Sequence, residues 1–512
     1  MRLSIHQINT KTLGFESNAK AMLSRLRKSG SESLSIFPEL SLSGMPLFDN
    51  IRYDSTYKLS SQYSELISKQ SQDMVFGAPL RIENKRYNSL VFIEKGELIG
   101  ISRKKNLGIY DQGFDRGEGF STLRYKNNMI GFGFLDDFLE VSLKDSPKLS
   151  LIILSSNNIF SLSSRTRLLK DLIIKARQYS CPIVFLNNLG SEGGSLFSGH
   201  SFVLNSRGEL AYELALFEEE SKHIIVDELK PMNNNPISKY ETIYKALVFA
   251  VKDYFAKNNI PRAMIGLSGG IDSALVASLV KDALGAENLM GLILPSEFSS
   301  SHSIKDAQDL ASNLGIDHHI ISIEDAFNLL SEDLSTYHSS EFSVADENIQ
   351  SRIRCNILMW FANKLGAGLF NTTNKSEFAV GYGTLYGDTS GAMSLLGDLL
   401  KTEVWELSKW INREEEIIPW NSIHKPPSAE LRPDQKDTDS LPDYSVLDKI
   451  ITEFLERRIT EEEIVSENNF DEALVNRTLR LIRQNEWKRR QCPIPIKISD
   501  SCFGIDIKFP LT

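Results

Sequence analysis

Short apolar runs alternate with amphipathic segments along the first half of the chain. The segment 18–28 has helical periodicity, and hairpin turns are predicted near residues 96–100 and 207–210. Apolar runs typical of buried strands lie at residues 3–8, 34–37, 74–77, 89–94, 129–134, 151–154, 183–186 and 201–204. Strands that alternate with helices and hairpins predict an α/β domain in which helices cover a sandwich of sheets.

The second half follows a more regular pattern, in which each apolar run precedes an amphipathic helix. The predicted strands lie at residues 263–265, 289–294, 318–323 and 369–370, and the predicted helices lie at 240–256, 274–284, 306–314 and 402–411. Successive units of this kind predict a doubly wound parallel sheet with its binding site at the carboxyl ends of the strands. A polar segment with a proline at each end, 231–236, separates the halves and predicts domains at 1–230 and 240–512 with a linker at 231–239.

Composition narrows the class of protein. The chain has 512 residues, which is too long for one hydrophobic core, and its net charge of -10 argues against a protein that coats nucleic acid. No apolar run approaches the roughly 20 residues needed to cross a bilayer. The four cysteines lack CxxC spacing, which points to a reducing compartment and to no zinc site. We therefore expect a cytoplasmic protein with neither a nucleic-acid partner nor a membrane partner.

Residues 266–273, Gly-Leu-Ser-Gly-Gly-Ile-Asp-Ser, lie between a predicted strand and a predicted helix. Glycines let backbone N–H groups approach a phosphate, and the helix N-terminus adds partial positive charge. Ser268, Asp272 and Ser273 add hydroxyls and a carboxylate that can reach phosphate oxygens or Mg²⁺. A helix N-terminus that is simply capped by serine and glycine would explain the turn, but it would not explain the carboxylate of Asp272 beside it. The lysine of the Walker A loop is missing, and the stretch instead resembles the loop of the N-type ATP pyrophosphatases.

Other polar residues follow the later predicted strands. Glu377 comes after the strand at 369–370 and is placed to complete Mg²⁺ coordination with Asp272. Arg352 lies on a predicted helix and can fork onto a phosphate or a carboxylate, although an isolated arginine of this kind is more often a surface ion pair. Lys401 opens a helix, where a cation opposes the helix dipole, and an anionic ligand would explain it.

Taken in order, the motifs SGGIDS, ENIQSRIR, TTNKSE, GYGTLYGD, PPSAELRPDQ and EWKRRQ resemble the NAD synthetase domain of the glutamine-dependent NAD synthetases, over residues 240–505. The resemblance implies an adenine nucleotide α-hydrolase-like fold and a homo-oligomer. It implies that ATP is bound by Gly266, Leu267, Ser268, Gly269, Gly270, Ile271, Asp272, Ser273, Thr372, Lys401 and Ser428. It also implies deamido-NAD contacts from Arg352, Glu377 and Lys488, Mg²⁺ ligation by Asp272 and Glu377, and catalytic roles for Asp272, Lys401 and Asp388.

Glu39, Lys104 and the turn at 135–139 lie at predicted strand ends in the first half. Each alone has an ordinary structural explanation, but together they resemble the Glu-Lys-Cys site of the nitrilase-like glutamine amidase domain, an α-β-β-α sandwich. The resemblance makes Glu39 the general base and Lys104 the oxyanion-stabilising lysine. Where that family has a Cys-Glu-Asp-Leu-Trp turn, this chain reads Leu135 followed by Asp-Asp-Phe-Leu. Because leucine cannot attack an amide carbon, we expect a vestigial amidase.

A second amidase segment, which is acidic around a Phe-Asp-Gly turn in that family, lacks its acidic residues here at 193–199. We therefore expect ATP-dependent amidation of deamido-NAD, with free ammonia rather than glutamine as the nitrogen donor. Three alternatives stay open: a functional glutamine-hydrolysing synthetase whose nucleophile lies elsewhere, such as Cys181; another N-type ATP pyrophosphatase that amidates a different carboxylate; and a scaffold without catalytic activity.

Overall fold

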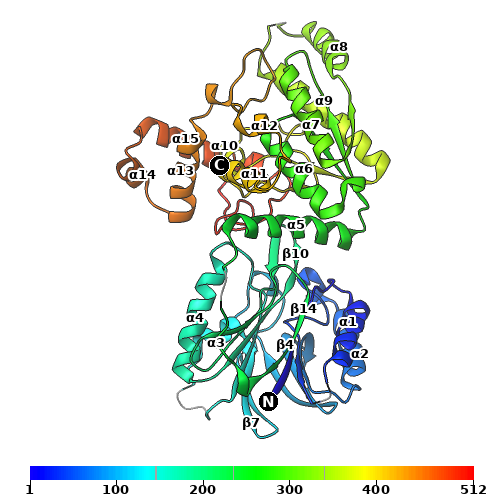
Figure 1. Ribbon diagram of the computed structural model, residues 1–512, viewed down its shortest axis with the longest axis vertical. Helices are drawn as coiled ribbons and strands as arrows, with labels where there is room; N and C mark the ends of the chain where they lie inside the picture. The colour runs from blue at the N-terminus through cyan, green and yellow to red at the C-terminus, as the bar shows by residue number, and fades with distance from the viewer. Residues whose placement is uncertain (31, 144–146, 234–235, 340, 512) are drawn as a thin grey trace. The chain divides into compact units, whose positions relative to one another are not determined.

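The computed structural model describes residues 1–30, 32–143, 147–233, 236–339 and 341–511. The chain divides into two compact units, one formed by residues 1–192 and 196–237 and the other by residues 193–195 and 238–512 (Figure 1). Residues 234 and 235 of the predicted linker lie outside the described residues. Within the part that is described, no helix is both long enough and apolar enough to span a bilayer.

Unit 1 contains two six-stranded sheets. The first has the order β14 (Glu220–Ile225), β1 (Arg2–Gln7), β2 (Leu34–Ile36), β3 (Met74–Ile82), β4 (Lys85–Glu94), β5 (Glu97–Arg103). The second has the order β13 (Leu210–Glu213), β12 (Phe202–Leu204), β9 (Ile183–Asn187), β8 (Leu151–Ser156), β7 (Asn128–Phe134), β6 (Ser121–Tyr125). A short hairpin of β10 (Leu189–Glu192) and β11 (Ser195–Ser198) follows β9.

Alternation along the strands explains why the two sheets pack face to face. Leu3 and Ile5 of β1 share one buried cluster with Ile130 and Phe132 of β7, because every second side chain points inward. The outer faces are covered by α1 (Phe15–Lys28) and α2 (Asp54–Ser68) on one side, and by α3 (Leu135–Glu140) and α4 (Ser164–Tyr179) on the other (Figure 1). The predicted α-β-β-α sandwich is confirmed.

One hairpin turn lies earlier than predicted. Residues 97–100 belong to strand β5, and the chain turns at Lys95 and Gly96 instead. Both turn residues have positive φ, 49° and 87° respectively, which is the backbone twist that a tight two-residue hairpin requires.

Unit 2 contains a five-stranded sheet of order β17 (Asp317–Ile320), β16 (Leu289–Ile293), β15 (Arg262–Gly266), β18 (Ala367–Asn371), β19 (Met393–Ser394). All four pairings are parallel. From the central strand β15 the chain builds outward first to β16 and β17, and then returns to add β18 and β19 on the other side. The doubly wound sheet is confirmed, and its switch point lies between β15 and β18.

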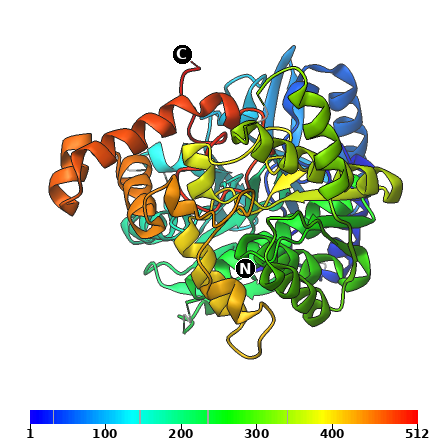
Figure 2. The same cartoon turned by 90° about the horizontal axis from the view of Figure 1, so that it is seen from above.

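Twelve α-helices lie in the described part of unit 2. They are α5 (Lys239–Asn258), α6 (Ile271–Leu284), α7 (Ser301–Leu314), α8 (Glu324–Ser335), α9 (Val344–Leu365), α10 (Lys375–Val380), α11 (Lys401–Ile411), α12 (Trp420–His424), α13 (Tyr444–Thr452), α14 (Glu461–Asn468), α15 (Glu472–Gln484) and α16 (Glu486–Arg489). Helices α6 and α9 both pack against β15. Helix α6 is buried on every side from residue 273 to 280, which explains why this segment is apolar apart from Ser273 and Ser278. Helices α13 to α15 pack on one another, in orange to red (Figures 1 and 2).

Candidate functional site

The glycine-rich stretch forms the turn between β15 and α6, as the sequence predicts. Gly269 has a φ of 77°, and a Cβ added there would lie 2.2 Å from the Ser303 carbonyl oxygen, so that only glycine fits. The Ser268 hydroxyl accepts a hydrogen bond from the Gly270 N–H at 3.2 Å and lies 3.1 Å from the Ser273 hydroxyl. These bonds hold the turn in shape at the N-terminus of α6.

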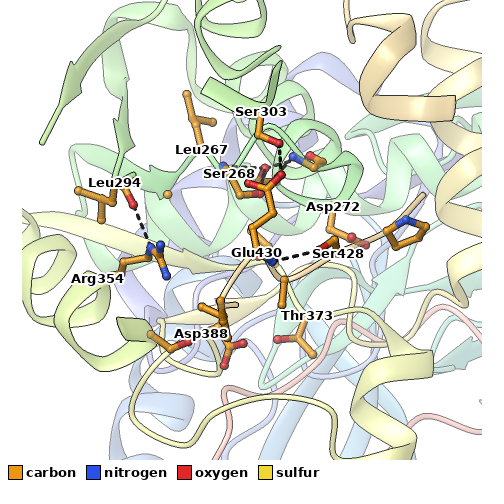
Figure 3. A pocket seen from close by; sticks show the side chains of 18 of the residues that line it. Leu267, Ser268, Asp272, Leu294, Ser303, Arg354, Thr373, Asp388, Ser428 and Glu430 are labelled. Carbon is orange, nitrogen blue, oxygen red and sulfur yellow. Dashed lines mark hydrogen bonds between the residues drawn. The ribbon is translucent and has the colours of Figure 1, made fainter. Parts of the chain in front are cut away.

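A cavity of about 330 Å³ lies above the turn. Its walls also come from the chain after β16, from α9, from the segment between β18 and α10, and from the loop at 426–431 (Figure 3). A volume in this range is typical of a small-molecule site. The cavity is lined by twelve of the site residues that the sequence predicts: Gly266, Leu267, Ser268, Gly270, Ile271, Asp272, Ser273, Thr372, Glu377, Asp388, Lys401 and Ser428.

Lys401 joins two carboxylates at this cavity. Its ammonium lies 2.5 Å from Asp272 Oδ2 and 3.7 Å from Glu377 Oε1, and its side chain is buried. Burial favours the neutral amine, but the Asp272 and Glu377 carboxylates outweigh it and raise the pKa of Lys401 above its ordinary value. Burial, together with the nearby Asp272 charge, raises the pKa of Glu377 to about 8. Lys401 therefore stays a cation between two acidic side chains.

The acidic side chains at the cavity fit a magnesium ion bound together with a phosphate. In the described part of the chain, His, Cys, Asp and Glu side chains do not gather in threes or more in a way that would hold a metal. Asp272 and Glu377 supply two carboxylates from two strand ends. Mg²⁺ is commonly bound by one or two carboxylates, with water and substrate phosphates completing its octahedral shell.

The loop at 426–435 closes one side of the cavity. The Glu430 carboxylate accepts hydrogen bonds from the hydroxyls of Ser300, at 2.9 Å, and Ser303, at 2.7 Å, so the loop is tied to the start of α7 (Figure 3). The Ser428 hydroxyl accepts from the Glu430 N–H at 3.1 Å. Ser428 thus lies on the cavity wall as expected, while Glu430, which is 130 residues from Ser300 in sequence, was missed.

An arginine that the sequence analysis did not single out, Arg354, lines the cavity. Ser351, Arg354, Cys355 and Leu358 line it, and their i, i+3, i+4, i+7 spacing makes them one face of α9. The Arg354 Nε donates to the Leu294 carbonyl at 2.9 Å, and burial lowers the pKa of Arg354 to about 10 (Figure 3). The periodicity groups Ser351 with Arg354, but the sequence alone does not show which face of α9 lines the cavity.

Arg352 and Lys488 do not line the cavity but hold a neighbouring loop, residues 381–388. Arg352 Nε donates to the Leu385 carbonyl at 3.3 Å. Lys488 Nζ donates to the carbonyls of Gly381, at 2.9 Å, and Gly383, at 3.1 Å. Asp388, at the end of this loop, lines the cavity and accepts from the Thr384 N–H at 2.6 Å. The side chains of Arg352 and Lys488 therefore help to hold the loop that carries Asp388 in place.

Unit 1 holds the charged residues of the expected vestigial amidase site. The Lys104 ammonium lies 2.8 Å from Glu39 Oε1 and 2.9 Å from Asp111 Oδ2. The Asn88 amide donates to both carboxylates, at 2.6 Å and 2.8 Å, and all four side chains are buried. Lys104 also lies 5.5 Å from the centre of the Phe134 ring, and Leu135 follows directly as the first residue of α3. Leu135, which the sequence resemblance sets at the amidase nucleophile, thus directly follows the residue whose ring lies near Lys104, and its own side chain packs in an apolar cluster.

Cys181 does not have the surroundings of a catalytic thiol. It is fully buried in an apolar cluster at the start of β9, and burial raises the pKa of its thiol to about 12. A nucleophilic cysteine needs a lowered pKa and access to substrate. The structure therefore argues against Cys181 as the missing nucleophile.

Burial of Glu39 predicts a pH dependence of stability. Burial raises the pKa of Glu39 from 4.5 to about 7, so the folded chain binds this proton more tightly than the unfolded chain does. The resulting stability is complete below pH 4.5 and is lost as the pH rises through 7. The Glu39→Gln variant has no charge at this position at pH 5 or at pH 8. Its free energy of unfolding, relative to that of the natural protein, should therefore rise between pH 5 and pH 8 by on the order of 2–3 kcal/mol.

Calorimetric thermal unfolding of both proteins at pH 5 and pH 8 measures this change. Glu97→Gln, an exposed glutamate at the start of β5, serves as the control and should show no such change. A difference between Glu39→Gln and the natural protein that is the same at both pH values would contradict the expectation.

Comparison with known proteins agrees with this arrangement. The sequence model of the NAD synthase family matches residues 243–492. A glutamine-dependent NAD(+) synthetase from Thermotoga maritima is 33% identical, and the alignment covers 100% of this chain and 98% of the relative. Another, from Synechocystis sp., is 34% identical over 99% of this chain and 98% of the relative. The solved structure of glutamine-dependent NAD+ synthetase from Acinetobacter baumannii in complex with ADP has a TM-score of 0.79 and 29% identity, and covers 100% of this chain and 98% of that one.

Proposed function

The chain belongs to the glutamine-dependent NAD(+) synthetases, which are carbon–nitrogen ligases, and we propose that this member takes its nitrogen from free ammonia instead of glutamine. The observation that carries the proposal is Leu135. Leu135, at the place that resembles the amidase cysteine, directly follows Phe134, whose ring centre lies 5.5 Å from the Lys104 ammonium. A base and an oxyanion donor without a nucleophile cannot form an acyl-enzyme.

We assign the synthetase reaction to the cavity of unit 2. The nicotinate carboxylate of deamido-NAD attacks the α-phosphorus of ATP, pyrophosphate leaves, and ammonia then displaces AMP to give the amide. The glycine turn before α6 suits ATP phosphates, because its N–H groups and helix dipole favour anions. The ADP in the related Acinetobacter baumannii structure supports an adenine nucleotide here. Thr372 and Ser428, on the cavity wall, are assigned to ATP.

The roles of the charged residues at the cavity follow from their charges. Asp272 and Glu377 would hold Mg²⁺, which neutralises the charge that builds on the departing pyrophosphate. Lys401 lies between these carboxylates and stays protonated. Its ammonium can therefore bind phosphate oxygens without first gaining a proton. Asp388 faces the cavity from the loop held by Arg352 and Lys488. We assign this loop and its two cations to deamido-NAD, with Glu377 lying between the two substrates.

The purified protein with ATP, deamido-NAD and ammonium tests this function. Equal amounts of AMP, pyrophosphate and NAD are expected. Release of ADP and phosphate would contradict cleavage between the α- and β-phosphates. AMP formed only with a different carboxylate would favour another N-type ATP pyrophosphatase. The cytoplasmic location and the homo-oligomer expected from the sequence remain part of this proposal.

A further inference from the structure

Asn374, the first residue before α10, contacts both carboxylates assigned to Mg²⁺. Its Oδ1 accepts from the Glu377 N–H at 3.1 Å, and its own N–H lies 3.3 Å from Glu377 Oε2, which forms a reciprocal cap. Its Nδ2 donates to Asp272 Oδ1 at 2.9 Å. The residue is fully buried, so its own polar atoms are shielded from water. One residue thus ties together two carboxylates from α6 and α10, the helices that follow the two strands at the switch point of the sheet.

The bonds of Asn374 and Lys401 divide the four carboxylate oxygens between them. Lys401 faces Asp272 Oδ2 and Glu377 Oε1, whereas the Asn374 side-chain amide donates to Asp272 Oδ1 and the Asn374 backbone N–H donates to Glu377 Oε2. Each carboxylate is therefore held from two sides. The two partners differ in charge: the ammonium neutralises part of the carboxylate charge, whereas an amide orients a carboxylate and leaves its charge available to a metal ion.

Capping alone does not require asparagine. Serine, threonine and aspartate cap helices about as well, because capping needs only a side-chain oxygen that accepts from the first turn. The bond to Asp272 needs a donor on the same side chain, and of these residues only asparagine combines an acceptor oxygen with a donor group of this reach. The hydrogen bond from Asn374 to Asp272 therefore indicates that Asn374 has a function besides stabilising α10.

We propose that Asn374 is a positioning residue for Mg²⁺, which fixes Asp272 and Glu377 relative to each other so that both reach the ion. This inference rests on the proposed function, because it takes the two carboxylates as the magnesium ligands. Groups that orient metal ligands typically contribute 10–100-fold to metal affinity when measured by substitution. The same range is expected for the loss of the Asn374 amide.

Asn374→Ser separates positioning from capping, because serine keeps the cap and loses the donor to Asp272. Two quantities are measured as free Mg²⁺ is titrated at saturating ATP: the rate of NAD formation and the melting temperature. The serine variant should need roughly 10–100-fold more Mg²⁺ for half of each effect. Without Mg²⁺ and ATP, its melting temperature should stay close to that of the natural protein.

Thr460→Ala is the matched control, because Thr460 and Glu463 form the same reciprocal cap at the start of α14, away from the cavity. It should lower the melting temperature and leave the Mg²⁺ requirement unchanged. Asn374→Thr also keeps a cap without an amide, and it replaces the serine variant if that variant does not fold.

An unchanged Mg²⁺ requirement in a folded serine or threonine variant would overturn the assignment. So would the failure of both variants to fold, since Asn374 would then serve the fold. These outcomes are distinct from failure of the proposed function, in which the natural protein itself would make no NAD or would need no Mg²⁺.

Discussion

Asp272→Ala is expected to lower NAD synthesis by about 1,000-fold or more, because metal stabilisation of a phosphoryl transition state is worth several kcal/mol. Asp272 starts α6 beside the glycine turn, where Lys401 and Asn374 hold its two oxygens. Alanine removes one of the two carboxylates available to Mg²⁺ and leaves Lys401 with Glu377 alone. Glu377→Ala should give a loss of similar size, since it removes the other carboxylate.

Initial rates of NAD formation at saturating ATP, deamido-NAD, ammonium and Mg²⁺ measure this loss. Asp282→Ala is the control, because Asp282 is an exposed acid on the same helix. It should retain full activity. Circular dichroism should show that both variants are folded. An Asp272→Ala variant that keeps more than a tenth of the activity would remove Asp272 from the catalytic site.

Local features of the fold and site were predictable because they depend on neighbours in sequence. The turn at 266–273 is recognisable from an apolar strand, glycines and a helix in succession, and the structure has it between β15 and α6. The pair Glu39 and Lys104, 65 residues apart, is not local: the resemblance to the amidase family suggested it, and the two side chains do meet. The layers of both units followed from alternation and helical periodicity, because burial imposes those patterns.

Features that depend on sheet order and helix phase were not predictable. Asn374 reaches Asp272 only because β18 lies next to β15, and no spacing along the chain reveals that pairing. Glu430 meets α7 through a loop that returns from far along the chain. Arg354 differs from Arg352 by two residues, which on a helix is enough to point a side chain to a different face.

Glutamine is expected to support NAD synthesis at a rate on the order of 10⁴-fold or more below that with ammonium. Groups of a catalytic triad act as a unit, so loss of the nucleophile removes nearly all of the catalysis. Glu39 and Lys104 persist, but Leu135, at the position that resembles the amidase cysteine, supplies no nucleophile and packs in an apolar cluster. Loss of the acidic residues at 193–199 should weaken glutamine recognition independently.

Cys181→Ala provides the matched control for a misplaced nucleophile. Because Cys181 is buried and its thiol pKa is raised, the variant should match the natural protein with either nitrogen source. If glutamine proved active and Cys181→Ala abolished only that activity, the nucleophile would be Cys181.

The decisive measurement is NAD formation by the purified protein with ammonium-free glutamine, compared with ammonium, in the presence of ATP, deamido-NAD and Mg²⁺. The glutamine-dependent NAD(+) synthetase from Thermotoga maritima, run in parallel, shows that the glutamine supplied is usable. We predict NAD with ammonium, and with glutamine neither NAD nor glutamate above background. NAD formed from glutamine at a rate comparable to that with ammonium, with release of glutamate, would contradict the account.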